Sequence, residues 1–349
     1  MSDRTTAADH ELPAQNQGPD KPSGGAPRTS GRIPSSVVRN LGLVIALLLL
    51  LVVGVISSGE SFASTDNMMT ILRLGATLGV VSIGMTFVIT GGGIDLSVGA
   101  VLALASVWAS TTGTMAMAED VHWIAIVTTA LLVGTAAGAV NGVLIAYGRV
   151  VPFIATLAML ASARGLAELM SDQQTQIVSD TAFLDFFRAD VVGVPAIVII
   201  FAVVAVIGWV VLNRTTFGRR TFAVGGNPEA ARLAGIKVQR HTLYLYALAG
   251  LCAGIGAVML MARTTTGTST HGQLMELDAI AAVVIGGTLL SGGRGSIVGT
   301  VLGVLILTTL SNVFTQNNMS TSAQATAKGV IIVVAVLLQQ WLARRNKNT

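Results

Sequence analysis

Ten apolar runs divide this chain, and most approach the roughly 20 residues that an α-helix needs to cross a bilayer. Only 11% of the residues are charged, 52% are hydrophobic and the mean hydropathy is +0.73, which excludes a soluble domain. The sequence therefore predicts an all-α, polytopic membrane protein with about ten transmembrane helices. The runs cover residues 41–57, 67–90, 96–113, 122–147, 152–170, 194–212, 241–262, 276–290, 296–314 and 324–342.

Charged residues between the runs separate by sign, and this predicts the orientation because short cytoplasmic loops retain Lys and Arg. With ten spans, the basic residues named below fall on one side and the acidic residues named below on the other. Both termini are therefore predicted to be cytoplasmic, and the net charge of +4 reflects this bias rather than nucleic-acid binding. The predicted inner side holds Arg32, Arg39, Arg149, Arg214, Arg219, Arg220, Arg232, Lys237, Arg240, Arg344, Arg345 and Lys347, and the outer side holds Glu60, Asp66, Glu119, Asp120, Asp172, Asp180, Asp185 and Asp190.

Three regions follow from this pattern. Residues 1–33 are rich in Pro, Gly, Ser, Thr and Gln, and we expect a disordered cytoplasmic extension because so little apolar surface cannot offset the entropy of ordering. The extension lacks the apolar core of a secretion signal, so the first run is expected to remain as a span. Residues 34–343 form the predicted transmembrane domain, whose largest cytoplasmic loop covers 213–240. Residues 344–349 form a basic cytoplasmic tail.

A helix break is predicted at membrane depth, where three glycines and a carboxylate lie between two apolar runs in the segment GGGIDLSVG. Backbone freed from a helix at this depth needs protein or water partners, and an intramembrane carboxylate is expected to have a function. Asp95 could alternatively cap a following helix that begins near Leu96, and Asn141 could form an interhelical hydrogen bond. The residues predicted to line a translocation path are Gly92, Gly93, Asp95, Ser97 and Asn141.

An internal similarity links residues 91–102 (GGGIDLSVGAVL) with residues 291–302 (SGGRGSIVGTVL). Both segments would connect an inward-running span to an outward-running one, so they are either parallel repeats, with the path at their interface, or a chance similarity of Gly-rich sequence. Glycines also recur at four-residue spacing, which indicates either close helix packing or faces that slide during gating. These pairs and triplets are Gly75/Gly79, Gly134/Gly138/Gly142, Gly250/Gly254 and Gly299/Gly303.

The loop at 213–240 contains a complete signature of a short helix. Asn227 can cap free amides, Pro228 suits the first helical position, Glu229 complements the positive helix end, and Gly235 permits a left-handed stop. So short a helix needs a partner, either its own membrane domain or a cytoplasmic protein. The segment consists of Asn227, Pro228, Glu229, Ala230, Ala231, Arg232, Leu233, Ala234 and Gly235.

Four phrases make a resemblance specific: VSIGMTFVITGGGIDLSVGAVLAL, VPFIATLAMLASARGLA, NRTTFGRRTFAVGGNPEAARLAGIKV and ELDAIAAVVIGGTLLSGGRGSIVGT. From about residue 40 to residue 340 the chain resembles permease subunits of bacterial ATP-binding-cassette (ABC) importers for monosaccharides, the ribose, xylose, arabinose, galactose and autoinducer-2 group. Such a permease would lie in the bacterial cytoplasmic membrane. The resemblance implies that residues 227–235 form the coupling helix that enters a cleft of the ATPase.

The same resemblance implies three partners: a second permease subunit, identical or a paralogue, a tandem-domain ATPase, and an extracytoplasmic sugar-binding protein. ATP and magnesium would be bound by the ATPase, and no cofactor is expected in this chain. The sequence agrees independently, because a phosphate-binding loop needs Gly-Lys-Ser/Thr and no lysine here follows a glycine. We therefore expect a transport subunit rather than an enzyme.

Other functions are less well supported by the residues. There is no His-Glu-x-x-His, no Gly-x-Ser-x-Gly and a single cysteine, Cys252, so neither an intramembrane enzyme nor a metal site is predicted. A secondary transporter, or a permease for branched-chain amino acids or nucleosides, is the alternative. Aromatic residues make up only 5% of the chain, which favours a low-affinity conduit. Glu276 and Asp278 are expected at the outer boundary, as solvated charges or as contacts to the binding protein.

Overall fold

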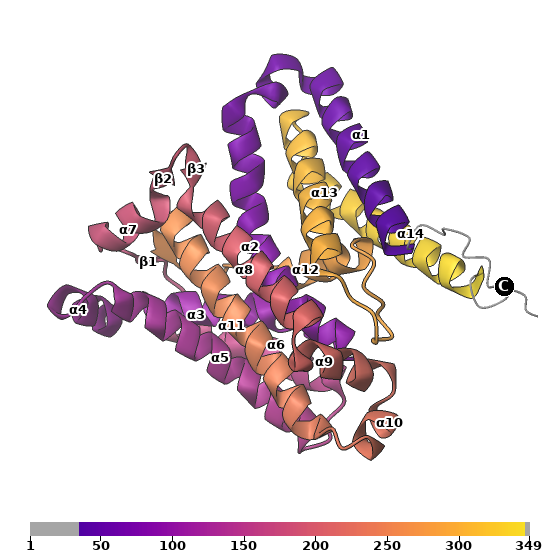
Figure 1. The fold of residues 1–349 in the computed structure, drawn as a ribbon. Helices are drawn as coiled ribbons and strands as arrows, with labels where there is room; N and C mark the ends of the chain where they lie inside the picture. Colours follow the sequence, from indigo (N-terminus) through magenta and orange to yellow (C-terminus); the bar gives the residue numbers. More distant parts are fainter. Residues whose placement is uncertain (1–34, 346–349) are drawn as a thin grey trace, which may run out of the picture. The chain divides into compact units, whose positions relative to one another are not determined.

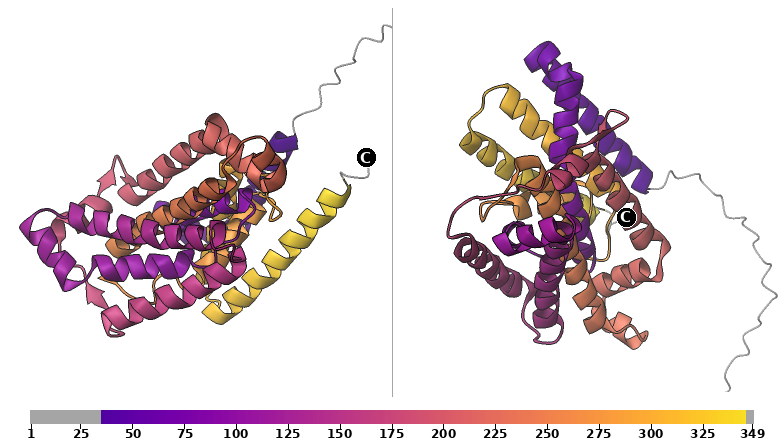
Figure 2. Two further views of the ribbon diagram at one scale, coloured as in Figure 1. Left: turned by 90° about the horizontal axis from the view of Figure 1, so that it is seen from below. Right: turned by 90° about the vertical axis from the view of Figure 1, so that its left-hand side faces the viewer.

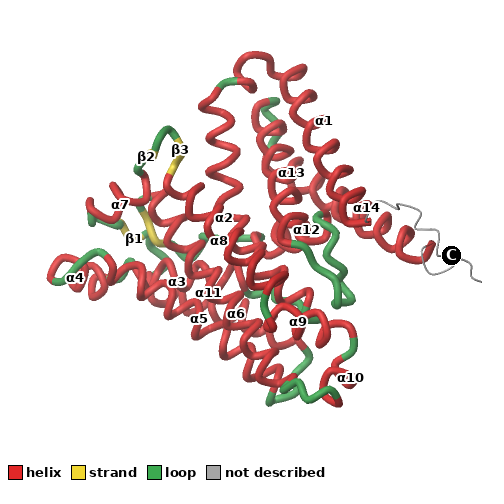
Figure 3. The backbone as a smooth tube through the Cα atoms, viewed as in Figure 1, coloured by secondary structure: helices red, strands yellow, loops and turns green. Residues whose placement is uncertain are grey.

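The computed structural model describes residues 35–345, so the predicted disordered extension at residues 1–33 and most of the predicted tail lie outside the described residues. Figure 3 shows that helices dominate the described part, as predicted, and that each strand is short. The helices are α1 (Ser35–Ala63), α2 (Thr65–Thr90), α3 (Val98–Ala109), α4 (Thr112–Asp120), α5 (Ile124–Ala146), α6 (Pro152–Ser171), α7 (Thr181–Arg188), α8 (Ala196–Arg214), α9 (Thr216–Gly226), α10 (Pro228–Leu233), α11 (Val238–Thr264), α12 (Met275–Ile285), α13 (Ile297–Gln316) and α14 (Thr321–Arg345). The strands β1 (Gln176–Ile177) and β4 (Thr266–Gly267) pair antiparallel, as do β2 (Asp190–Val191) and β3 (Val194–Pro195).

Each of the ten apolar runs forms a helix, but two helices are about half as long as expected. α3 has 12 residues and α12 has 11, so each is roughly 16–18 Å long and covers about half of a bilayer core. Among the described residues, seven helices are long and apolar enough to cross a membrane, or eight if α3 and α4, bent by 57°, count as one span. The prediction of about ten transmembrane helices is thus confirmed in outline: the tenth run forms α14, a 25-residue helix outside these seven, and α3 and α12 are half-length members.

The helical core is built around α2 and α11. In Figure 1, α11 (orange) runs alongside α5, and it also packs on α2 and α3. The glycines predicted to mediate close packing do so here, because a Cβ on Gly138 would lie only 3.0 Å from the Cα of Gly250. Gly254 faces α5 in the same way, 3.0 Å from the Cα of Leu131. Dense packing is therefore confirmed for the α5–α11 pair.

Hydrogen bonds between side chains hold α2 against α13 at two levels. Near the start of α2, Asn67 and Asn312 exchange Nδ2-to-Oδ1 bonds of 3.1 and 2.8 Å. Near its end, the hydroxyls of Thr86 and Thr300 lie 2.7 Å apart. Since buried polar groups in a membrane need protein partners, these bonds fix the register of the two helices that adjoin the predicted repeats.

The first helix has the surface of a lipid-facing span. In the most apolar stretch of α1, 18 residues long, only 6% of the residues are buried. The helix packs mainly against α13. Its exposed side chains are aliphatic, including Leu41, Leu48, Leu49 and Ile56. Such a helix would be insoluble in water and is stable in a bilayer, which agrees with a multi-pass membrane protein.

The predicted acidic and basic sides lie at opposite ends of the helices. Figure 1 shows α4, α7 and the β2–β3 hairpin at one end, and α9 and α10 at the other. Figure 2 (left) shows the first turn of α1 and the last turn of α14 toward the α9–α10 end. The arrangement agrees with the predicted topology, although which end faces the cytoplasm stays a prediction.

Candidate functional site

The predicted break in the first repeat begins where α2 ends at Thr90. The amides of Gly91, Gly92 and Gly93 close the helix by donating to the carbonyls of residues 87, 89 and 88 at 3.0, 2.9 and 2.9 Å. Gly92 adopts a φ of +85°, a conformation that side chains rarely tolerate. The glycine run therefore stops α2 at this depth, and the chain does not become helical again until Val98.

The three polar candidates form one hydrogen-bonded chain. Asp95 Oδ1 accepts from the Ser97 amide at 2.8 Å and from the Ser97 hydroxyl at 2.6 Å. Asn141 Nδ2 on α5 donates to that hydroxyl at 2.9 Å, so Asn141 does form an interhelical bond. All three residues are at most 1% exposed. Asp95 therefore bonds to Ser97, the residue before α3, and not to the amides of the first turn of α3. The helix begins at Val98, two residues later than the Leu96 that was expected.

Tyr246 is a site residue that the sequence reasoning did not identify. It projects from α11, is 1% exposed, and its hydroxyl donates to the Ile94 carbonyl at 3.2 Å. The available signal was a tyrosine inside an apolar run, since a buried tyrosine hydroxyl needs an acceptor. Tyr246 on α11 and Asn141 on α5 therefore each hold the broken segment by one hydrogen bond.

The predicted second repeat forms a second break, between α12 and α13, and the two breaks touch. Gly293 donates its amide to the Thr90 carbonyl at 2.9 Å. Gly292, with a φ of +79°, lies so close to the first break that a Cβ there would be 2.9 Å from the Cα of Gly92. The two similar segments are therefore neighbours in space. The helices that lead into them differ in length, because α2, before the first break, has 26 residues and α12, before the second, has 11.

A glycine of α9 completes this contact. A Cβ added to Gly225 would overlap the Thr90 carbonyl and would lie 2.7 Å from the Gly293 amide nitrogen. Only a residue without a side chain allows α9 to touch both breaks at once. We call Gly92, Gly225, Gly292 and Gly293 the glycine contact.

A cavity of about 400 Å³ adjoins the glycine contact and is also lined by Pro228 of α10, so it lies toward the end that is predicted to be cytoplasmic, and we call it the inner cavity. Gly92 and Gly93 line it, with Gly225, Ser291 and Tyr246. Two of the predicted path residues therefore face a cavity, whereas Asp95, Ser97 and Asn141 are sealed inside the helices. In this single chain the glycines line a cavity, and the polar residues shape the backbone that carries them. That the segment lines a translocation path stays a prediction.

The short helix predicted at residues 227–235 is present as α10. Asn227 Oδ1 accepts from the Ala230 amide at 3.0 Å, and the Ile236 amide donates to the Ala231 carbonyl at 3.0 Å after Gly235 turns at a φ of +83°. Each end is therefore capped as predicted. Leu233 is 85% exposed, whereas Ala231 is 4% exposed and packs inward, so Ala231 does not belong to an exposed docking face.

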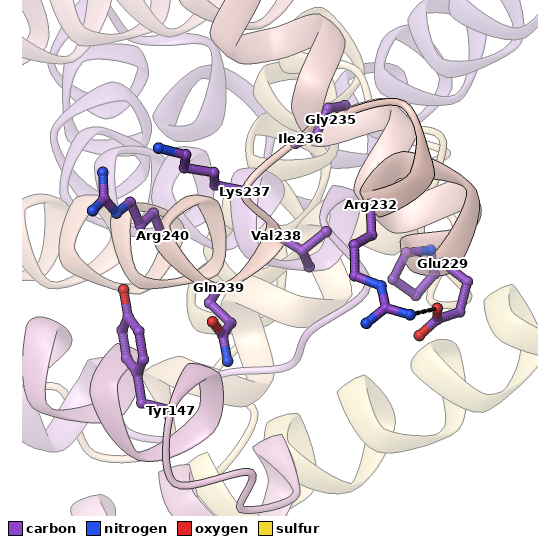
Figure 4. A pocket seen from close by; sticks show the side chains of 10 residues that line it. Tyr147, Glu229, Arg232, Gly235, Ile236, Lys237, Val238, Gln239 and Arg240 are labelled. Atoms are coloured by element: carbon purple, nitrogen blue, oxygen red, sulfur yellow. Dashed lines mark hydrogen bonds and ion pairs between the residues drawn. The ribbon is translucent and has the colours of Figure 1, made fainter.

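A second cavity, of about 670 Å³, lies beside α10. Figure 4 shows that its lining joins two separate parts of the chain: Tyr147, after α5, and the turn between α10 and α11 with the first residues of α11. Glu229 and Arg232 form an exposed ion pair of 2.9 Å at its edge. A cleft of this size beside an exposed helix can accept part of another protein.

Comparison with known proteins assigns the chain to a family. Residues 67–338 match the family described as the permease component of branched-chain amino acid transport systems. The chain is also 42% identical over 310 residues to the ribose import permease RbsC of Bacillus subtilis, covering 87% of this chain and 94% of that protein. This chain belongs to that permease family.

Two further members of the permease family are similar to this chain. The D-allose transport system permease AlsC of Escherichia coli K12 is 35% identical over 287 residues, which is 82% of this chain and 87% of that protein. The L-arabinose transport system permease AraH of the same strain is 36% identical over 289 residues, which is 80% of this chain and 84% of that protein. No solved structure matches this chain. The aligned lengths show that at least four-fifths of this chain is shared with each of these permeases.

Proposed function

We propose that this chain is the membrane-spanning subunit of a bacterial ABC importer that moves a monosaccharide, of the pentose or hexose class, into the cytoplasm. The observation that carries the proposal is the similarity, over four-fifths of the chain or more, to permeases named for ribose, allose and arabinose. Those names concern three monosaccharides, which favours a sugar over the amino acid in the family's description.

The proposed assembly contains two permease subunits, identical or paralogous, a tandem-domain ATPase and an extracytoplasmic sugar-binding protein. ATP and magnesium belong to the ATPase in this arrangement. The exposed, capped helix α10 and the cavity beside it support a docking site for the ATPase. A permease of this kind also needs no cofactor of its own.

A route for coupling follows from the connection of α10 to α9. Asn227 alone separates the two helices, and Gly225 in the last turn of α9 touches both breaks. When the ATPase moves α10, α9 moves with it, and the glycine contact opens or closes. The inner cavity lined by Gly92 and Gly93 would then gain or lose its connection to the cytoplasm.

Transport by the reconstituted importer tests the proposal. Vesicles containing this permease, its ATPase and its binding protein are loaded with ATP and offered labelled D-ribose, D-allose, L-arabinose, L-leucine or adenosine. We expect uptake of at least one monosaccharide and none of L-leucine or adenosine. Uptake of L-leucine or adenosine without any monosaccharide would refute the sugar assignment, and uptake without the ATPase would refute the importer class.

The docking role of α10 has its own test. Glu229→Lys and Leu233→Glu change the exposed face of α10 and should lower co-purification of the ATPase while the permease still inserts. Asp185→Lys, an exposed charge reversal on α7 at the opposite end, is the matched control and should have no effect. Normal ATPase recruitment and transport by both α10 variants would show that α10 only stabilises its loop.

A further inference from the structure

An outer cavity of about 220 Å³ lies between α2, α12, α13 and α14. Arg263, in the last turn of α11, is one of its lining residues, whereas α10 adjoins the first turn of α11. Since α11 has 27 residues and is about 40 Å long, the cavity and α10 lie at opposite ends of the membrane domain. In the proposed topology the cavity therefore belongs to the outer half.

A buried hydroxyl without a partner lines this cavity. Thr77 on α2 is 1% exposed, and its Oγ1 has no hydrogen-bond partner in the described part of the chain. Thr308, which lines the same cavity, instead donates to the Val304 carbonyl at 2.9 Å. Leaving a buried hydroxyl unpaired costs about 1–3 kcal/mol, so a sugar hydroxyl that reached Thr77 after a small separation of the helices would gain this bond.

The other polar groups of the cavity supply both signs of charge. Lys328 Nζ lies 3.1 Å from Asp278 Oδ2, with the two side chains 23% and 32% exposed. Arg263 and Gln273 add further donors. Asp278 thus lies in the first turn of α12 and stays partly exposed, as expected of a helix-end charge, but it also has an ion-pair partner. Both side chains line the cavity and keep part of their surface exposed, so a solute in the cavity can reach them.

We propose that the outer cavity is a binding subsite for one neutral monosaccharide, an inference that rests on the proposed function. Sugar hydroxyls both donate and accept, so they fit a lining in which Asp278 accepts, Lys328, Arg263 and Gln273 donate, and Thr77 does either. Leu74 and Met275 offer apolar surface to the C–H groups of the ring. The volume holds about seven waters, below the range for drug-sized ligands and suited to one small ring.

The outer and inner cavities divide the proposed path along α2. Thr77 and Gly91 are 14 positions apart, which corresponds to about 21 Å of helix between the outer and inner cavities. All residues from Gly75 to Thr90 are buried. A sugar received in the outer cavity therefore has to wait there until the helices around α2 rearrange.

Protection of a cysteine from modification tests the subsite without the binding protein. Cys252 is the chain's only cysteine and is replaced by alanine, and Ser311→Cys places a thiol in the cavity lining. The importer complex in nanodiscs is treated with a membrane-impermeant thiol reagent in the presence of the transported monosaccharide, L-leucine or inorganic phosphate. We expect only the monosaccharide to slow modification.

Two sets of variants connect protection to the named groups. Thr77→Val keeps the shape and removes one hydrogen bond, so it should raise the half-protecting sugar concentration about five-fold. The control is Thr70→Val, on the same helix but exposed and outside the cavity. It should leave the half-protecting sugar concentration unchanged. Exchanging the charges, Asp278→Lys with Lys328→Asp, keeps an ion pair between α12 and α14 but moves the acceptor, so the importer should assemble yet lose protection.

The outcomes separate the subsite from the proposed function. If the vesicles import a monosaccharide but that sugar never protects the cysteine, the subsite is refuted and the function stands. Protection that is unchanged in both Thr77→Val and the charge exchange also refutes it, as does stronger protection by phosphate. If no monosaccharide is imported at all, the proposed function itself has failed.

Discussion

At the scale of single residues, the direction of the hydrogen bonds around Ser97 explains why three polar side chains are buried together. The Ser97 hydroxyl has one proton, which it donates to Asp95, and it accepts from Asn141. Asp95 therefore needs to be an acceptor only, and Asn141 a donor. The structure supports a role for this chain of bonds in holding the break before α3, and a direct contact with substrate stays a prediction.

Asp95→Ala should destabilise the permease, because it leaves the Ser97 amide and hydroxyl unpaired in a buried site. We expect a loss of about 1–3 kcal/mol in the free energy of unfolding, and uptake that falls by more than membrane abundance. Asp95→Asn keeps an acceptor oxygen, so its free energy of unfolding should fall by less than that of Asp95→Ala. Thermal unfolding of the detergent-solubilised proteins measures the difference, and equal midpoints for the two variants would contradict it.

His271 lies in the loop between α11 and α12 and is 8% exposed. Its Nδ1 lies 3.1 Å from the Ser106 hydroxyl and its Nε2 lies 3.3 Å from the Thr264 hydroxyl. Burial, together with the nearby cations of Arg263 and Arg164, lowers the pKa of His271 from 6.5 to about 4. The imidazole is therefore neutral in the folded protein at neutral pH.

This shift predicts a specific loss of stability in acid. The unfolded chain binds a proton at His271 near pH 6.5, whereas the folded protein does so only near pH 4. Stability from this residue is thus complete above pH 6.5 and falls by up to about 3 kcal/mol as the pH drops to 4. We expect the thermal unfolding midpoints of wild type and His271→Asn, measured between pH 4 and 7.5, to converge at low pH. A constant difference between the two midpoints over this range would contradict the lowered pKa of His271.

At the scale of elements, α9 and the two breaks meet without side chains between them. Gly225→Ala should displace α9 from the breaks, because its Cβ would overlap the Thr90 backbone. Gly226→Ala is the matched control, since nothing lies within 4 Å of its added Cβ. We expect Gly225→Ala to hydrolyse ATP with little uptake and Gly226→Ala to transport normally. Equal transport by the two would show that this contact does not couple α10 to the path.

The elements also show what the sequence could predict. Asn227, Pro228 and Gly235 specify the ends of α10 through bonds to residues within five positions, so local patterns were sufficient. The lengths of α3 and α12 were not predictable from hydropathy. The apolar run at 276–290 continues past Ile285 through residues that are no longer helical, and hydropathy counts both kinds alike.

Contacts between distant residues were beyond local patterns for a similar reason. Asp278 and Lys328 are 50 positions apart, and nothing in either neighbourhood indicates the other. The same holds for Tyr246 and Ile94. The sequence could identify Asp95, Ser97 and Asn141 singly as costly polar residues in apolar runs, but only the packing of α5 beside α3 shows that they form one chain of bonds.

At the scale of the whole molecule, the orientation in the membrane can be measured directly. In a Cys252→Ala background, Arg220→Cys in α9 and Asp180→Cys before α7 place thiols at opposite ends. We expect an impermeant reagent added outside intact cells to modify the cysteine at 180 and not the one at 220. The reverse pattern would overturn the topology and, with it, the assignment of outer and inner cavities.

The glycine contact also has a thermodynamic consequence. Glycine has no rotamers, so the four glycines themselves would contribute no change in side-chain entropy if these backbones separated and rejoined during transport. The glycine contact also has no side chain that a conservative substitution could enlarge or shorten slightly. Small changes in the transport rate would therefore have to come from residues elsewhere in the chain.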